Sequence, residues 1–83
     1  MEIKNVKRIE EILIREVATI LSIDPATVKP EAPLQTLGVD SLSFVELLVV
    51  IERIFALNLM ESGLTRQDFQ SISSLASRIG RMA

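Results

Sequence analysis

Prolines interrupt residues 22–40 and constrain the fold more than any other feature of the sequence. They are Pro25, Pro30 and Pro33. Proline removes a backbone N–H and blocks helix continuation, so no single helix crosses this stretch. Before it, residues 5–21 repeat apolar side chains at every third or fourth position, and Asn5 is the expected N-cap. We therefore predict a helix over residues 5–21, followed by a long loop whose own apolar residues hold it to the core.

Residues 41–57 predict the second and most apolar helix, with either Asp40 or Ser41 as its N-cap. Leu47, Leu48, Ile51, Ile54 and Phe55 share one face at spacings of three and four. That face is the expected core surface of the helix.

The remaining residues predict a connection over residues 58–64, a short helix over residues 65–70 and a last helix in which Gly80 is a fraying or stop signal. Thr65 and Ser71 are the expected N-caps, and Asp68 is expected to point outward. The expected fold is all-α: a single domain, residues 1–83, forming a four-helix bundle. It has three main helices, one short helix and a long loop between the first two main helices.

Composition excludes several kinds of function. The chain has no cysteine, so disulfides and thiolate metal sites are impossible, and it has no histidine, so the commonest general base is absent. Its net charge is −2 with scattered Lys and Arg, which argues against nucleic-acid binding. No apolar run approaches the length of a membrane span, and no signal peptide is evident. We expect a cytoplasmic protein without a membrane segment, a metal site or enzymatic activity.

A second strip of residues runs along the helix predicted over residues 41–57. It comprises Leu42, Val45, Glu46, Val49 and Glu52, with Arg53 beside Glu52. Two interpretations are open. In the first, the valines simply flank a wide core face and the carboxylates lie at its solvated edge. In the second, the strip docks a basic partner, with apolar contact area and orienting charges.

Ser41 also has two interpretations. A serine before an apolar helix is commonly only an N-cap. Without histidine, its hydroxyl has no obvious base to make it a nucleophile, so it is better placed to be modified. A phosphate ester there would lie at a helix N-terminus, where free N–H groups and the helix dipole favour negative charge.

Four short motifs, taken together, are specific enough to indicate a protein family. They are Ile23-Asp24-Pro25, Pro33-Leu34, Leu37-Gly38-Val39-Asp40-Ser41-Leu42 and Val45-Glu46-Leu47. In this order and in a chain of this length, they resemble the acyl carrier protein family over nearly the whole sequence. In that family, the serine of an Asp-Ser-Leu motif carries 4′-phosphopantetheine, whose thiol holds acyl groups as thioesters.

The resemblance implies a role for each matching residue. Ser41 would be the attachment site, Asp40 would help a phosphopantetheinyl transferase to place its metal and coenzyme A, and Gly38 would form the turn that presents the serine. The strip of Leu42, Val45, Glu46, Val49 and Glu52 would bind partners. These partners would be the transferase and the enzymes of acyl-chain synthesis and transfer, which would meet the carrier as a monomer.

The chain also departs from the family. Ser43 and Arg53 stand where acids are common, and the charge of −2 is low for a general fatty-acid carrier. These differences favour a carrier dedicated to one pathway of fatty-acid, polyketide-type or other specialised synthesis. An aminoacyl cargo is an alternative, and so is a helical protein-interaction module without a prosthetic group.

Overall fold

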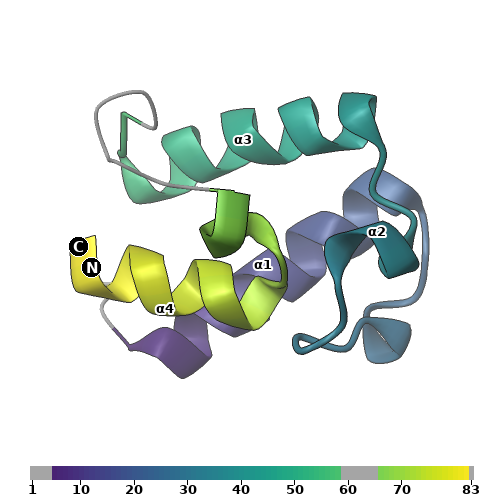
Figure 1. The fold of residues 1–83 in the computed structure, drawn as a ribbon, viewed down its shortest axis with the longest axis horizontal. Coiled ribbons are helices and arrows are strands. Elements are labelled where there is room, and N and C mark those ends of the chain that lie inside the picture. The colour runs from purple at the N-terminus through teal and green to yellow at the C-terminus, as the bar shows by residue number, and fades with distance from the viewer. Residues whose placement is uncertain (1–4, 59–65, 83) are drawn as a thin grey trace.

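The computed structural model describes residues 5–58 and 66–82, which form α-helices and short 3₁₀ turns. In chain order they are α1 (Val6–Leu21), the turn η1 (Pro25–Thr27), α2 (Leu34–Leu37), α3 (Ser41–Phe55), the turn η2 (Arg66–Phe69) and α4 (Ile72–Met82) (Figure 1). No strand occurs within these described ranges, where the β-type pairing is a single isolated bridge between Pro33 and Ser71. The predicted all-α fold with three long helices is confirmed.

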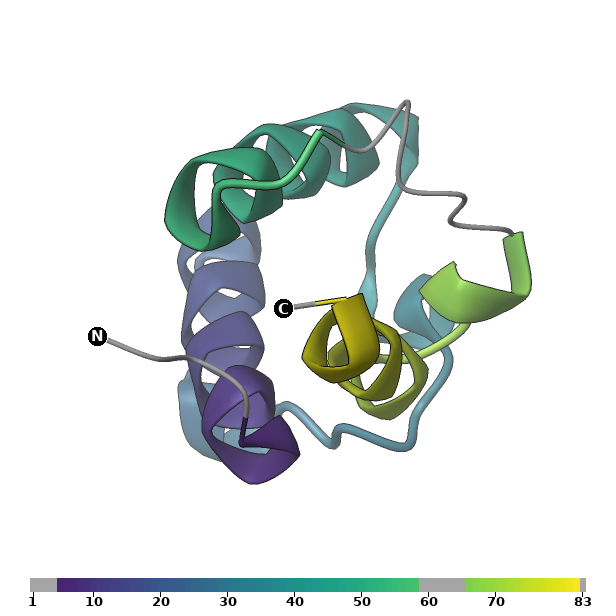
Figure 2. The same cartoon turned by 90° about the vertical axis from the view of Figure 1, so that its left-hand side faces the viewer.

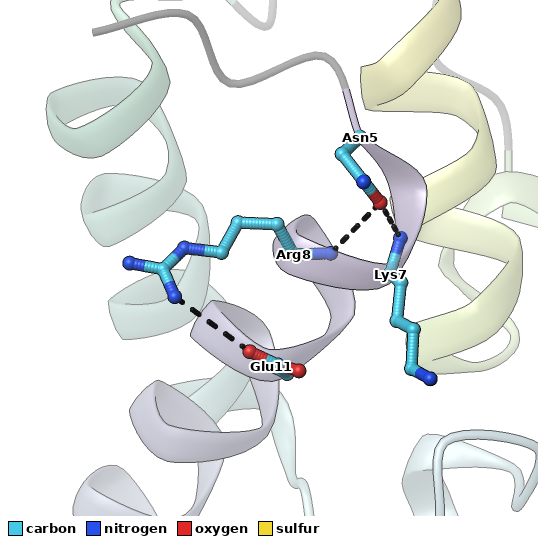
Figure 3. A network of polar contacts seen from close by, with 4 residues as sticks. All are labelled: Asn5, Lys7, Arg8 and Glu11. Carbon is cyan, nitrogen blue, oxygen red and sulfur yellow. Dashed lines mark hydrogen bonds and ion pairs between the residues drawn. The ribbon is translucent and has the colours of Figure 1, made fainter.

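The start of α1 agrees with the sequence prediction. The Asn5 side-chain oxygen accepts hydrogen bonds from the backbone N–H groups of Lys7 at 2.9 Å and Arg8 at 3.4 Å (Figure 3). These bonds satisfy donors that the first helical turn leaves unpaired. Arg8 also lies 3.8 Å from Glu11 in an exposed ion pair, a kind of contact that adds little stability. The helix ends at Leu21, because the next residue, Ser22, has a left-handed backbone (φ 57°).

The core forms where α1 packs against both α3 and α4, so α1 is the shared support of the other two long helices (Figure 2). The buried apolar side chains are Ile9, Leu13, Val17, Ala18, Val28, Leu34, Leu47, Ile51, Ile72, Leu75, Ala76 and Ile79. They come from all three long helices and from the loop between α1 and α3. Within the described residues, no helix is both long enough and apolar enough to cross a membrane.

The loop between α1 and α3 contains two short helical elements, η1 and α2. At its start, Asp24 accepts a hydrogen bond from the backbone N–H of Ala26 at 2.9 Å and so caps η1, with Pro25 at the first position. This single turn is one that the sequence favours. Later in the loop, α2 adds one further helical turn after Pro33, in a stretch that the sequence pattern predicts as loop.

Two long-range backbone hydrogen bonds attach the loop to the start of α4. Leu34 N–H donates to the carbonyl of Gln70 at 2.9 Å, and Ser73 N–H donates to the carbonyl of Pro30 at 2.9 Å. We call this pair the loop clasp. It holds α2 beside the junction of η2 and α4, and Leu34 is buried at that contact. Val28, Leu34, Leu37 and Val39 therefore hold the loop to the core, as expected, and backbone pairing helps them, whereas Ile23 is exposed and does not.

Several predicted boundaries are wrong. The helix expected over residues 41–57 ends at Phe55, because Ala56 adopts a left-handed backbone (φ 54°). The last helix passes through Gly80 and ends at Met82, so the glycine lies within its last turn.

The short helix expected over residues 65–70 is the 3₁₀ turn η2, and its predicted cap Thr65 lies outside the described residues, as does most of the connection 58–64. Asp68 does not point outward as expected. Its side chain is only 18% exposed and lies 3.9 Å from the guanidinium of Arg78 on α4. That ion pair helps to hold η2 against α4.

Candidate functional site

The turn that leads into α3 depends on a glycine. Gly38 ends α2 with φ 104°, a backbone region that L side chains rarely adopt. Its N–H donates to the carbonyl of Gln35, and the N–H of Val39 donates to the carbonyl of Leu34, both at 3.1 Å. A Cβ added at Gly38 would meet no atom within 4 Å. The glycine is therefore required by the backbone conformation and not by lack of space.

Asp40 is the N-cap of α3, which decides between the two residues that the sequence left open. One of its carboxylate oxygens, Oδ1, accepts from the backbone N–H of Ser43 and from the Ser43 hydroxyl, each at 2.8 Å. The backbone bond from Ser43, followed by the hydroxyl bond, lowers the pKa of Asp40 below its ordinary value of 3.8. Asp40 is therefore ionised at neutral pH while it caps the helix.

Ser41 is the first residue of α3, and its side chain is exposed. Because Asp40 provides the cap, the Ser41 hydroxyl is not needed to satisfy the helix. Within the described ranges, this hydroxyl has no hydrogen-bond partner. The position combines an accessible hydroxyl with the N–H groups of a first helical turn, where negative charge is favoured. Such a hydroxyl can carry a phosphate ester.

Ser41 lines an open groove. Apolar side chains of its lining include Val39, Phe44 and Phe69. The rings of Phe44 and Phe69 meet edge to face, with centroids 5.1 Å apart and an interplanar angle of 75°. Phe44, whose environment the sequence did not reveal, is therefore half-buried between α3 and η2.

The second strip of α3 is exposed, which separates it from the core face of the same helix. Leu42 is 71% exposed, Val45 55% and Val49 47%, whereas Leu47 is 1% exposed. Glu46 is also exposed, and Glu52 is half-buried. The interpretation of the valines as the flank of a wide core face does not fit these exposures. An exposed apolar strip of this kind is typical of a contact surface.

The structure brings most of the sequence-predicted residues together. Gly38, Asp40 and Ser41 form one continuous turn into α3, Leu42 follows Ser41 directly, and Val45 lies one helical turn further on. Glu46, Val49 and Glu52 extend the strip toward the far end of α3.

Sequence reasoning missed the part of the groove that Gln35, Gln70 and Ser74 contribute. These residues reach the site through the loop clasp, for which the sequence carries no local signal. The part of the chain that the structure describes contains no cluster of carboxylates that could hold a metal ion.

Comparison with known proteins agrees with this geometry. The family model described as phosphopantetheine attachment site matches residues 11–79. Neither a curated protein nor a solved structure matches the chain significantly. Because the family model covers most of the sequence, the chain belongs to the phosphopantetheine-attachment family of carrier domains. Its cofactor is covalently attached 4′-phosphopantetheine, and the earlier alternative of an interaction module without a prosthetic group does not fit this membership.

Proposed function

We propose that Ser41 is the attachment site and that the chain is an acyl carrier dedicated to one biosynthetic pathway. This proposal rests on the different roles of Asp40 and Ser41 at the start of α3. Asp40 accepts the capping hydrogen bonds from Ser43, so the exposed Ser41 hydroxyl beside it is left for modification. Of the serines in the described residues, Ser41 alone follows a glycine-dependent turn and begins a long helix.

The modification would join the Ser41 oxygen to the phosphorus that bears the pantetheine arm of coenzyme A. The pyrophosphate bond of coenzyme A would break, the adenosine bisphosphate would leave, and the hydroxyl proton would pass to a base of the transferase. The attached group supplies a thiol that holds an acyl group as a thioester. The chain has no cysteine, so this thiol would be the only one it carries.

The exposed strip of α3 is the proposed docking surface for the transferase and for the enzymes that load, extend and release the cargo. Leu42 and Val45 supply apolar contact area next to Ser41, and Glu46 supplies a charge that attracts basic partners. A small surface of this kind favours rapid association and rapid release, which suits a carrier that meets several enzymes in turn. We propose that the chain is a non-catalytic monomer that carries acyl groups. An aminoacyl cargo is the alternative to test.

Intact mass measurement tests the attachment site. The purified chain is incubated with coenzyme A, Mg²⁺ and a broad-specificity phosphopantetheinyl transferase. We expect a gain of one phosphopantetheine in the wild type and none in Ser41→Ala. The Ser77→Ala variant is the matched control, because Ser77 is an exposed helical serine on α4. Full modification of Ser41→Ala, or no modification of a folded wild type, would refute the assignment.

A further inference from the structure

The exposed side chains of α3 form one face, which we call the α3 face and which contains both an acid and a base. Its members are Ser41, Leu42, Val45, Glu46, Val49 and Arg53. At its far end this face differs from the strip that the sequence pattern predicted. Glu52, which belongs to the predicted strip, is half-buried, whereas its neighbour Arg53 is exposed. The charged residues of the α3 face are therefore one carboxylate near Ser41 and one guanidinium near the end of the helix.

Helix geometry places Arg53 in line with the exposed apolar residues. Because each residue turns an α-helix by about 100°, Arg53 lies within about 40° of both Leu42 and Val49 around the axis. Glu52 is turned away from Leu42 by about 80°. Along the axis, Glu46 and Arg53 are about 10 Å apart, and α3 runs along one edge of the molecule, where a partner can reach both (Figure 1).

Arg53 is not held by another side chain. It has no ion-pair partner among the described residues. A basic residue in the last turn of a helix gains a little stability from the helix dipole, and Arg53 occupies that position. This role concerns the helix alone and would leave reactions with partners unchanged, so an experiment can separate it from a role in docking.

The spacing of the two charges decides how a partner meets them. About 10 Å exceeds the Debye length of about 8 Å in physiological salt, so Glu46 and Arg53 act as separate charges and not as a neutral whole. A partner surface that is basic throughout would be attracted by Glu46 and repelled by Arg53. A surface with a base opposite Glu46 and an acid opposite Arg53 would be attracted by both.

We propose that Arg53 determines partner specificity, and that the α3 face fits enzyme surfaces of mixed charge. Such a surface has an apolar centre, a basic group beside the entrance that receives Ser41, and an acidic group about 10 Å further from that entrance. The inference deepens the proposed docking role of α3 and rests on it. Arg53 acts mainly by rejecting uniformly basic partners, since unlike charges attract weakly at a surface whereas a wrong partner is penalised by repulsion.

The order of the charges also gives the α3 face a direction. If α3 lay reversed on its partner, Arg53 would meet the base and Glu46 the acid, so both contacts would be repulsive. Only one orientation brings Ser41 to the entrance of the partner's active site with both pairs matched. The two charges therefore align the attachment site as well as select the partner.

Phosphopantetheinylation kinetics on the full chain test this proposal with two transferases. The first has a carrier-binding face that is basic throughout, and the second is its variant with Glu in place of the basic residue that faces the last turn of α3. Intact mass gives kcat/KM for each. At low salt, the wild type should react several times faster with the second transferase, and Arg53→Glu should reverse this preference. Both preferences should shrink in about 1 M salt, where the Debye length is about 3 Å.

Matched variants give each result a clear meaning. Arg53→Lys should keep the wild-type preference and Arg53→Gln should abolish it, which covers the case that Arg53→Glu does not fold. Arg15→Glu on α1 makes the same charge change at another exposed arginine and should keep the wild-type preference.

Modification at Ser41 with the same preference in the wild type and Arg53→Gln would overturn the inference and leave the attachment site intact. A reversed preference in Arg15→Glu would also overturn it, because net charge would then be the cause. A folded wild type that gains no mass with either transferase would overturn both proposals.

Discussion

Leu42 and Leu47 carry the same side chain on the same helix, but α3 presents them to opposite environments. Leu42 is 71% exposed and Leu47 is 1% exposed. Fully burying a leucine side chain contributes about 1.5–3 kcal/mol, so Leu42→Ala should lower the free energy of unfolding by less than about 1 kcal/mol. Leu47→Ala also leaves a cavity between α3 and its neighbours, and should lower the free energy of unfolding by about 2–5 kcal/mol.

These losses are measurable against the total stability. A chain of 83 residues has a free energy of unfolding of about 4–12 kcal/mol. Urea unfolding followed by far-UV circular dichroism gives both values, and Leu47→Met is the control, because it keeps the volume and should cost less than about 1.5 kcal/mol. The two variants should also differ in function. Leu42→Ala should slow phosphopantetheinylation while the chain stays folded, since Leu42 lies beside Ser41 on the proposed docking strip.

Equal destabilisation by Leu42→Ala and Leu47→Ala would refute this orientation of α3, and with it the assignment of the strip. A Leu42→Ala variant that is modified at the wild-type rate would keep the orientation but remove Leu42 from the docking surface. The paired design separates these outcomes because both substitutions remove the same atoms.

Four further predictions concern the turn and the strip. Gly38→Ala should lower the free energy of unfolding by about 1–2 kcal/mol, because φ 104° is strained for alanine although no atom obstructs its Cβ. Urea unfolding measures this loss, and an unchanged midpoint would show that the turn relaxes. The folded-state pKa of Asp40 is depressed, so its contribution to stability is present above the unfolded-state pKa and is lost as pH falls below 3.8 through the folded-state value. Asp40→Asn keeps a capping oxygen and should lose less stability over that range in urea midpoints measured against pH, whereas parallel curves would contradict the assignment. Ser43→Ala should move the pKa of Asp40 back toward 3.8 in a ¹³C NMR titration, and Ser43→Thr should retain the shift. Glu46→Lys should slow reactions with basic partners at low salt, whereas Glu11→Lys on α1 should not; equal rates for both variants would place the docking charge elsewhere.

The sequence predicted the long helices because their signals are local. Asn5 and the apolar repeat behind it define the start of α1 without help from the rest of the fold. The same is true of Asp24 and Pro25 at η1, where a capping side chain and a preset φ act within one turn. The Asp-Ser-Leu motif likewise located the start of α3, because its residues are consecutive.

Other features depend on tertiary context, which a local pattern does not carry. Asp40 and Ser41 are both good N-caps, and only the side-chain geometry with Ser43 decides between them. Gly80 is a signal for a helix end, but α4 passes through it and ends at Met82, so the glycine did not fix the last residue. The polar side of the groove was missed because Gln70 meets α2 through the loop clasp, a pairing between residues distant in the sequence.

The loop clasp also has a consequence for the order in which the chain folds. Its two hydrogen bonds enclose the whole of α3 between their ends, and contacts of such long sequence separation carry a large loop-closure cost. We expect the long helices to form early and the clasp to close last. We expect the turn at Gly38, which follows α2 directly, to reach its final position only when the clasp has closed. A transferase that requires this turn would modify completed molecules and pass over partly folded ones, so that attachment of the arm would also report on the quality of the fold.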